Sequence, residues 1–343
     1  MIVLFVVVAA VLTSLGTQFM RKVALRFNIA DHPNERRINM QPGPRAGGLS
    51  VAVVFTLVGG ALILLAPQLQ ISPGSGAERL TDQGAAALLG GTLIAGIIGF
   101  IDDRYDLRAR WQIIGQLLIS LIPIAFGLRI LFVSNPFGAG VLLFPDAVAL
   151  GVTIFWTLGM QNSMNFIDGL DGLSGGISLL AAVTLGLIAL PTSPLLAALC
   201  FTLAGALVGF LRHNFHPASI YMGTSGILAV AYALAVLAIL GTAKVAAALL
   251  ILGVPIIDAF FVILGRILAG RSPYTPDKSH IHRRLLDNGF SHRSAVLVLY
   301  GITALLSIGA LLLTESATLY AFAGLLVVLG GVAVYLSRRA EGL

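Results

Sequence analysis

The segment GLSGGISLLAAVTLGLIALPTSPLLAALCFTLAGALVGFL, residues 172–211, decides the fold class because it contains no charged side chain. A helix that crosses the hydrocarbon core of a bilayer needs roughly 20 mostly apolar residues. The segment is therefore long enough for two such helices. Pro191 and Pro194 mark the hairpin between them, because proline interrupts a helix.

Further apolar stretches on both sides of this pair predict a polytopic bundle. The chain of 343 residues is 57% hydrophobic and only 10% charged, a composition that excludes an ordinary water-soluble domain. We therefore predict a single all-α integral membrane domain, 1–343, with about eleven transmembrane helices. The approximate centres of the predicted spans are Val11, Thr56, Ala95, Ser120, Phe155, Val183, Leu203, Tyr232, Val254, Leu305 and Leu326.

The lysines and arginines are distributed unevenly among the loops. All but three of the 21 fall on one side of the predicted bundle, the exceptions being Arg79, Arg129 and Lys244. Because cytoplasmic loops carry the excess of basic residues, we expect a multi-pass protein of the bacterial inner membrane with its N-terminus outside and its C-terminus in the cytoplasm. The net charge of +6 then reflects contact with anionic lipid rather than with nucleic acid. The loops expected in the cytoplasm are 21–45, 102–111, 162–175, 211–219 and 266–294.

The groups able to do chemistry lie in the loops of that same side. All six histidines fall in them, whereas a transporter more often places its ionisable residues near the middle of the bilayer. The distribution favours an enzyme with its active site facing the cytoplasm. Asp258 is the one acid expected well inside a helix, either lining the active site or paired with a basic group such as Arg266. The single cysteine, Cys200, excludes an intrachain disulfide and a cysteine-based metal site.

The loop NSMNFIDGLDGLSGG, residues 162–176, is the strongest motif of the chain. Asn162 and Asn165 are one helical turn apart and Asp168 continues the spacing, so all three can share one face of a helix. Amide and carboxylate oxygens on one face can hold a metal ion and can hydrogen-bond a diphosphate or a nucleobase. A glycine-capped helix end could use the same letters for structural reasons, but the density of polar groups favours a functional site.

Two further loops contribute charge on this side. Asp102 and Asp103 directly follow a predicted span, and adjacent carboxylates at a membrane edge repel one another unless a cation compensates them. Hard oxygen ligands favour magnesium or manganese. Arg45, within GPRAGG at 43–48, suits phosphate binding because arginine presents several donors to phosphate oxygens. The structural alternatives are a solvated cluster at a helix end for the acids and an anchor at the lipid headgroups for the arginine.

The remaining cytoplasmic loops carry aromatic, amide and imidazole groups. Tyr221 could stack on a base and Asn214 could hydrogen-bond it, although an interfacial tyrosine is commonly an anchor. His280, His282 and Arg283 lie in a dense basic run. Since two imidazoles without a third ligand make a poor zinc site, phosphate binding fits this run better.

Together these residues resemble the polyprenyl-phosphate N-acetylhexosamine-1-phosphate transferase superfamily, glycosyltransferase family 4, over most of the chain. The family's aspartate pair matches Asp102 and Asp103, its NxxNxxDGxDGLxGG signature matches 162–176, and its HIHHRLL-like loop resembles 280–286. The last loop is more similar to the UDP-GlcNAc enzymes than to the phospho-N-acetylmuramoyl-pentapeptide transferases, whose loop has three consecutive histidines. The resemblance implies transfer of a sugar-1-phosphate, expected to be GlcNAc-1-phosphate, from a UDP-sugar to undecaprenyl or another polyprenyl phosphate. Release of UMP and initiation of a cell-envelope glycan would follow.

The resemblance also implies a magnesium ion, with manganese as the alternative, and roles for individual residues. Its implied partners are a UDP-sugar, a polyprenyl phosphate, membrane lipids and a second copy of the chain in a homodimer. The implied catalytic residues are Asp102, Asp103, Asp168 and His280. The implied metal ligands are Asp103, Asn162 and Thr224. The residues implied to bind substrate are Arg45, Asn165, Asp171, Asn214, Tyr221, His282 and Arg283, of which Asn165, Asp171, Asn214 and Tyr221 would hold the uridine.

The sequence departs from the family at two of these positions. Thr224 stands where the family's Met-Gly-Asp has its main magnesium aspartate, and Arg283 replaces a histidine. A threonine hydroxyl can still bind magnesium, and Arg283 keeps a cation available to phosphate. Three alternatives stay open: a phospho-N-acetylmuramoyl-pentapeptide transferase, a nucleotide-sugar or lipid transporter without chemistry, and a CDP-alcohol phosphotransferase. The DGxDG core of the CDP-alcohol phosphotransferase motif matches residues 168–172, but the residues that follow in this chain do not continue that motif.

Overall fold

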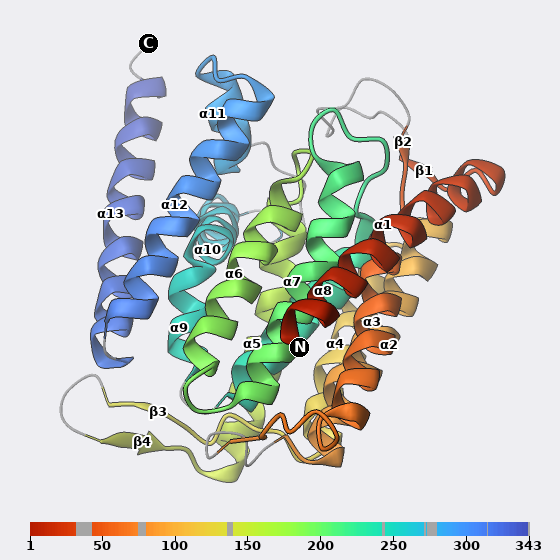
Figure 1. Cartoon of the computed structure of the whole chain (residues 1–343). Helices are drawn as coiled ribbons and strands as arrows, with labels where there is room; N and C mark the ends of the chain where they lie inside the picture. The colour runs from red at the N-terminus through yellow and green to blue at the C-terminus, as the bar shows by residue number, and fades with distance from the viewer. Residues whose placement is uncertain are drawn as a thin grey trace.

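The computed structural model of the chain is a helical bundle with two short β-hairpins (Figure 1). It describes residues 1–31, 43–74, 80–135, 140–241, 244–270, 272, 280–313 and 315–341, so the predicted loop segments at 32–42 and 273–279 lie outside the described residues. The helices are α1 (Ile2–Arg26), α2 (Leu49–Leu65), α3 (Asp82–Tyr105), α4 (Ala109–Ala125), α5 (Asp146–Ile167), α6 (Leu173–Ala189), α7 (Pro194–Asn214), α8 (Gly223–Leu240), α9 (Lys244–Ile251), α10 (Gly253–Leu268), α11 (Ile281–Asp287), α12 (His292–Leu312) and α13 (Glu315–Glu341).

Several helix ends follow directly from the local sequence. Helix α6 ends at Ala189 and α7 begins at Pro194, so the predicted hairpin is confirmed. Proline suits the first turn of a helix because the N–H that it lacks would have no partner there. Thr81 caps α3 by accepting a hydrogen bond from the Gly84 N–H at 3.2 Å, as threonine commonly does before a helix.

The two hairpins were not predicted from the sequence. Strand β1 (Ala30–Asp31) pairs antiparallel with β2 (Gly43–Pro44), and β3 (Phe132–Ser134) pairs antiparallel with β4 (Val141–Leu143). Strands of two or three residues are too short to show an alternating pattern, which explains why the sequence predicted helices alone. Figure 1 shows the hairpins at opposite ends of the bundle, with β1 and β2 at the end that carries α11.

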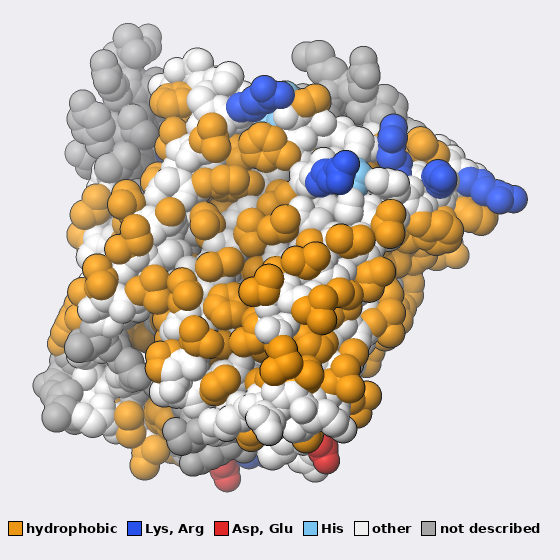
Figure 2. All heavy atoms as spheres, in the orientation of Figure 1, with side chains coloured by type: hydrophobic (Ala, Val, Ile, Leu, Met, Phe, Trp, Pro, Cys, Tyr) orange, Lys and Arg blue, Asp and Glu red, His pale blue; other side chains and the backbone are white. Residues whose placement is uncertain are grey.

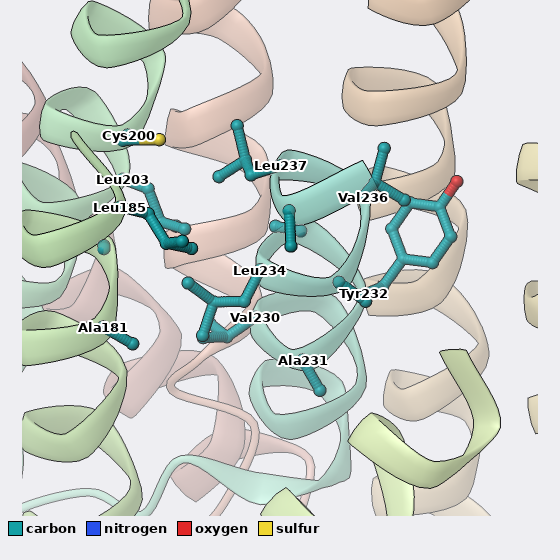
Figure 3. Close-up of a cluster of buried hydrophobic side chains, with 14 of the residues drawn as sticks. Ala181, Leu185, Cys200, Leu203, Val230, Ala231, Tyr232, Leu234, Val236 and Leu237 are labelled. Atoms are coloured by element: carbon teal, nitrogen blue, oxygen red, sulfur yellow. The ribbon is translucent and has the colours of Figure 1, made fainter. Parts of the chain in front are cut away.

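Helix α8 forms the centre of the bundle, and every one of its residues is buried. A helix that is apolar on all sides is expected in such a position. Figure 3 shows Leu234 and Leu237 on the side of α8 that faces α6 and α7, with Tyr232 on the opposite side. The Tyr232 hydroxyl donates to the backbone oxygen of Ala87 on α3 at 2.8 Å. This hydrogen bond holds the middle of α8 beside the N-terminal part of α3.

The bundle has the surface of a protein that lies in a membrane. By length and composition, five of the described helices, α1, α3, α7, α8 and α12, could cross a bilayer, and α9 with α10 would make a sixth that is bent by 76°. Figure 2 shows apolar side chains over the middle of one face, with basic side chains toward one end and acidic ones at the other. The chain is therefore a multi-pass membrane protein.

Candidate active site

A polar pocket of about 300 Å³ lies where the C-terminal ends of α3 and α5 meet the N-terminal ends of α4 and α8. Four residues predicted to belong to the site, from four separate segments, line it together. Its lining combines acids, amides, a hydroxyl, a guanidinium and apolar groups: Asp102, Asp106, Gln112, Gln116, Asn165, Thr224, Arg45, Ile98, Leu107, Trp111 and Leu228.

Asp102 is held on the pocket wall by three hydrogen bonds. Its Oδ1 accepts from Nε2 of Gln112 at 2.9 Å and from the Leu107 N–H at 3.1 Å. Its Oδ2 accepts from the hydroxyl of Thr224 at 2.7 Å. Hydrogen bonds to an ionised carboxylate are comparatively strong, so this set fixes the orientation of Asp102 toward the pocket.

Asp103 faces the interior of the protein rather than the pocket, and its side chain is completely buried. Its Oδ1 accepts from the Thr224 N–H at 2.8 Å and its Oδ2 from the Ser225 N–H at 3.0 Å. Both donors lie in the first turn of α8, where N–H groups lack partners inside the helix. Nε of Arg45 lies 3.5 Å from the same carboxylate. Gly99 permits this close approach of α3 to the start of α8, because a Cβ at position 99 would lie 2.5 Å from the Ser225 Cα. Asp103 thus caps α8.

Asp168 directly follows the last residue of α5. One of its oxygens accepts a hydrogen bond from the Ser174 hydroxyl of the next helix. Burial raises the pKa of Asp168 to about 6, while the Ser174 bond and the positive charge of Arg45 oppose the rise. Gly172 makes the turn into α6 possible, since its φ of 80° lies in the left-handed region. The charge of Arg45 therefore acts on two carboxylates, those of Asp103 and Asp168.

The two asparagines of the motif lie on α5 as expected, but only Asn165 lines the pocket. Asn162 donates its amide N–H groups to Oε1 of Gln116 at 3.0 Å and to the backbone oxygen of Leu158 at 2.8 Å. Because Gln116 itself lines the pocket, Asn162 supports the wall from behind.

Two of the residues expected to hold the uridine make contacts within the protein. Asn214 accepts from the Gly172 N–H at 3.1 Å and donates to the backbone oxygen of Ile220 at 3.0 Å. The ring of Tyr221 packs against Gly43, where a Cβ would lie 2.3 Å from the ring. These side chains join loops that are far apart in the sequence.

Asp171, a third residue expected to hold the uridine, lies in a cluster with two histidines. Its Oδ2 accepts from the Ala218 N–H at 3.1 Å and lies 2.8 Å from Nδ1 of His216, while its buried Oδ1 has no hydrogen-bond partner among the described residues. His292 accepts through Nε2 from the Asp171 N–H at 2.9 Å and stacks on His216 with 4.0 Å between ring centroids. One ligand atom from each of the three side chains lies within 4.8 Å of the others. Since both imidazoles already bond Asp171, the cluster serves to join three loops.

Helix α11 brings His280 to the motif loop. Nδ1 of His280 lies 2.8 Å from Oδ2 of Asp258, and Oδ1 of Asp258 accepts from the Ile281 N–H at 2.8 Å. Asp258 therefore pairs with a basic group, His280, in line with one of the two expectations for this acid. The His280 ring lies 5.6 Å, between centroids, from that of Phe166 on α5, just before Asp168.

His282 lies on the same short helix and is buried. It packs on Gly169, where a Cβ would lie 2.0 Å from the His282 Nε2. Close packing against His282 therefore explains why the motif has a glycine at this position. Burial lowers the pKa of His282 to about 4. Burial therefore favours the neutral form of the ring at pH 7, and the expected contact of His282 with substrate stays a prediction. Arg283 follows it, half-buried.

Sequence reasoning missed several residues that line the pocket or bond the predicted site residues. Gln112 and Gln116 are four residues apart on α4 and line it together, a spacing that could have indicated a shared helical face. Ser174 and His216 carried no local signal, because each acts through a contact with a residue elsewhere in the chain.

Comparison with known proteins bears on this site. Residues 85–242 match the family model described as glycosyl transferase family 4. The chain is 34% identical to a probable undecaprenyl-phosphate N-acetylglucosaminyl 1-phosphate transferase of Bacillus subtilis, covering 93% of this chain and 86% of that protein. It is 32% identical to a decaprenyl-phosphate N-acetylglucosaminephosphotransferase of Mycolicibacterium smegmatis, covering 88% of this chain and 79% of that protein. A phospho-N-acetylmuramoyl-pentapeptide-transferase of Trichormus variabilis is 38% identical, but over only 43% of this chain and 44% of that protein.

Proposed function

The chain belongs to glycosyl transferase family 4, and from this premise we propose that it is the enzyme that transfers GlcNAc-1-phosphate from UDP-GlcNAc to a polyprenyl phosphate, releasing UMP. The relatives that match most of the chain are named for transferases of N-acetylglucosamine phosphate to such carriers, whereas the pentapeptide transferase matches less than half of it. One observation of the structure carries the proposal: Arg45, Asp102, Asn165 and Thr224 line a single pocket. A guanidinium and oriented polar groups in one pocket suit a nucleotide diphosphate.

The arrangement in the membrane that we propose has eleven spans, with the N-terminus outside and the C-terminus in the cytoplasm of a bacterial inner membrane. Each of the eleven predicted span centres lies in a helix, which supports that number. Helices α9 and α10 would form one bent span, and α11 has only 7 residues and would lie outside the bilayer. The expected homodimer stays a prediction that the mass of the detergent-solubilised protein would test.

Mg²⁺, or Mn²⁺ in its place, is the ion that we propose for the pocket. The described lining residues offer oxygen atoms of carboxylates, amides and a hydroxyl, and none of them offers sulfur or imidazole, which suits a hard cation. Asp102, Asn165 and Thr224 would hold the ion, while Asp103 and Asn162 support these residues from behind. When bound, the ion would offset negative charge on the diphosphate.

The side chains of the chain then position the substrates. The acceptor phosphate is largely ionised at neutral pH, so its oxygen needs no base before it attacks the β-phosphorus of the UDP-sugar. The bond from the β-phosphorus to the bridging oxygen breaks, and UMP leaves. Arg45 would bind phosphate oxygens at the pocket, and Asp168 would help to hold Arg45 in place. His280, oriented by Asp258, would donate to the diphosphate or the sugar.

Thr224→Asp is expected to make the stability of the protein depend on a divalent cation. The new carboxylate would lie beside those of Asp102 and Asp103, and like charges in one site repel. We expect the variant to lose roughly 2 kcal/mol of unfolding free energy in chelator and to recover it in Mg²⁺, with tighter Mg²⁺ binding than the wild type. Thermal unfolding with and without Mg²⁺ measures this.

Thr224→Asn is the matched control for this experiment, because it has the size of the aspartate without its charge. It should show no such dependence on chelator. If Thr224→Asp left both the Mg²⁺ affinity and the transfer rate unchanged, Thr224 would not be at a metal site.

Asp258→Asn is expected to lower the transfer rate about 10- to 100-fold, by analogy with carboxylates that orient metal-bound imidazoles, whose removal typically costs that much. Asparagine cannot accept from both His280 and the Ile281 N–H as Asp258 does. Since Asp258 acts through His280, kcat should fall more than KM changes. Asp287→Asn, on the exposed surface of α11, is the control and should keep wild-type kinetics. Equal rates for Asp258→Asn and the wild type would remove this pair from the mechanism.

Transfer assays across a panel of labelled UDP-sugars test the proposed substrate. The purified protein, a polyprenyl phosphate and Mg²⁺ should form a lipid-linked product from UDP-GlcNAc. Preference for UDP-N-acetylmuramoyl-pentapeptide would favour the pentapeptide transferase instead. Uptake of a UDP-sugar into sealed vesicles without product would point to a transporter.

A further inference from the structure

A second cleft lies beside α1, away from the candidate active site. Its volume is about 430 Å³, and it shares no lining residue with the first pocket. Gln18, Arg21 and Lys22 of α1 form one side of it, and His213 and Ser219 form the other. No acid is among the described residues that line it.

The cleft follows from the way in which α1 crosses α7. Gly205 and Gly209 of α7 allow the two backbones to touch, because a Cβ on either would lie within 2.4 Å of the backbone oxygen of Val6 or Ala10 on α1. Glycines four residues apart commonly permit such close crossings in membranes. Figure 1 shows that α1 diverges from α7 toward its C-terminal end, beyond this crossing, and runs toward α2, where the Thr17 hydroxyl lies 2.7 Å from that of Ser50. The two helices therefore enclose a wedge that is open toward the end of the bundle where the candidate active site lies.

Uncompensated positive charge surrounds the mouth of the wedge. Arg21, Lys22 and Arg26 lie near the end of α1 and Arg212 near the end of α7, all of them exposed. Within the described part of the chain, none of the four forms an ion pair. Clustered cations at a membrane surface attract anionic headgroups, and basic pockets between membrane helices bind phosphates of lipids.

The same helix offers an apolar track that leads away from the wedge. Val11, Leu12, Leu15 and Phe19 of α1 are exposed, at 52%, 43%, 56% and 65%. They continue from the cleft toward the middle of the helix. A ligand that fits both parts has an anionic head and long apolar tails, which a free nucleotide or a soluble anion lacks.

We infer that the wedge between α1 and α7 binds an anionic phospholipid, with its phosphate at Arg21 and Lys22 and its acyl chains along the exposed face of α1. The lipid would join α1 to α7 at the end where the two helices diverge. The inference does not depend on the proposed transferase activity.

Lipid titration of the full-length protein by native mass spectrometry, from detergent, tests it. Phosphatidylglycerol should bind tightly and phosphatidylcholine with the same acyl chains should not. The double variant Arg21→Gln, Lys22→Gln should bind phosphatidylglycerol roughly 30-fold more weakly, since each cation near an anionic headgroup contributes about fivefold. Both side chains are exposed, so the fold should be unaffected, and thermal unfolding checks that.

Arg104→Gln with Arg108→Gln is the matched control, since it removes the same charge from exposed positions outside both clefts. It should bind phosphatidylglycerol as the wild type does. Equal binding of the two lipids, or wild-type affinity in the Arg21 and Lys22 variant, would overturn the inference. Displacement of phosphatidylglycerol by an equal amount of polyprenyl phosphate would assign the wedge to the carrier and would overturn it as well.

Discussion

Asp168→Asn is expected to lower UMP release at least about 100-fold, because the carboxylate helps to place positive charge at the reacting phosphates. The same variant should unfold at a higher temperature than the wild type at neutral pH. Activity and stability therefore change in opposite directions, as is common for residues whose burial serves function. UMP release and thermal unfolding, measured on the same preparations, test both parts.

The expected stabilisation follows from the pKa of Asp168. Burial raises that pKa from 3.8 to about 6, so the folded protein disfavours the ionised form more than the unfolded chain does. The contribution of Asp168 to stability is fully present below about pH 4 and is lost as the pH rises through about 6. Asparagine does not ionise, so the variant avoids this loss of stability. Its unfolding free energy should exceed that of the wild type by up to about 2 to 3 kcal/mol above pH 7. The gain should disappear near pH 4.

Asp146→Asn at the other end of α5 is the control for Asp168. Its side chain is 86% exposed, so the variant should keep wild-type activity and stability. Equal UMP release by Asp168→Asn and the wild type would remove Asp168 from the mechanism.

Asp103→Ala is expected to reduce the unfolding free energy by about 3 to 5 kcal/mol, whether or not Mg²⁺ is present. The substitution leaves Arg45 without this carboxylate and removes the acceptor of two N–H groups at the start of α8. Because α8 is the central helix, activity should be lost together with the fold. Thermal unfolding in chelator and in Mg²⁺ measures the effect.

This experiment separates two roles for Asp103. If Asp103 caps α8, the variant should lose the same unfolding free energy in chelator and in Mg²⁺. If Asp103 is a metal ligand, the loss of unfolding free energy should appear chiefly in Mg²⁺ and should be reduced at high Mg²⁺ concentration. Asp82→Ala is the control. Asp82 is an exposed acid in the first turn of α3, the helix that also carries Asp103, and its substitution should change the unfolding temperature little.

The helical part of the fold was predictable because each span leaves a local signal. The charge-free segment at 172–211 predicted α6 and α7 and the turn between them. The break between α9 and α10 was missed, because Gly253 and Pro255 lie in a stretch that is apolar on both sides. Hydrophobicity shows that a segment is buried in lipid but not that it bends there.

The composition of the site was predicted better than the individual roles. Asp102, Asn165 and Thr224 line one pocket, as the motifs indicated. The bonds of Asn214 and Asp103 to backbone groups of distant segments were not predictable, because a motif names residue types and not their partners. The sequence thus showed which side chains gather at one end of the bundle, while their hydrogen bonds show which of them face the pocket.

The fate of the β-phosphorus tests the central claim most directly. UDP-GlcNAc radiolabelled at that atom is incubated with the purified protein, a polyprenyl phosphate and Mg²⁺, and the lipid and nucleotide fractions are separated. The account predicts that the label moves to the lipid and that UMP forms in an equal amount. Label that stays with the nucleotide as UDP, or that does not move at all, would contradict it.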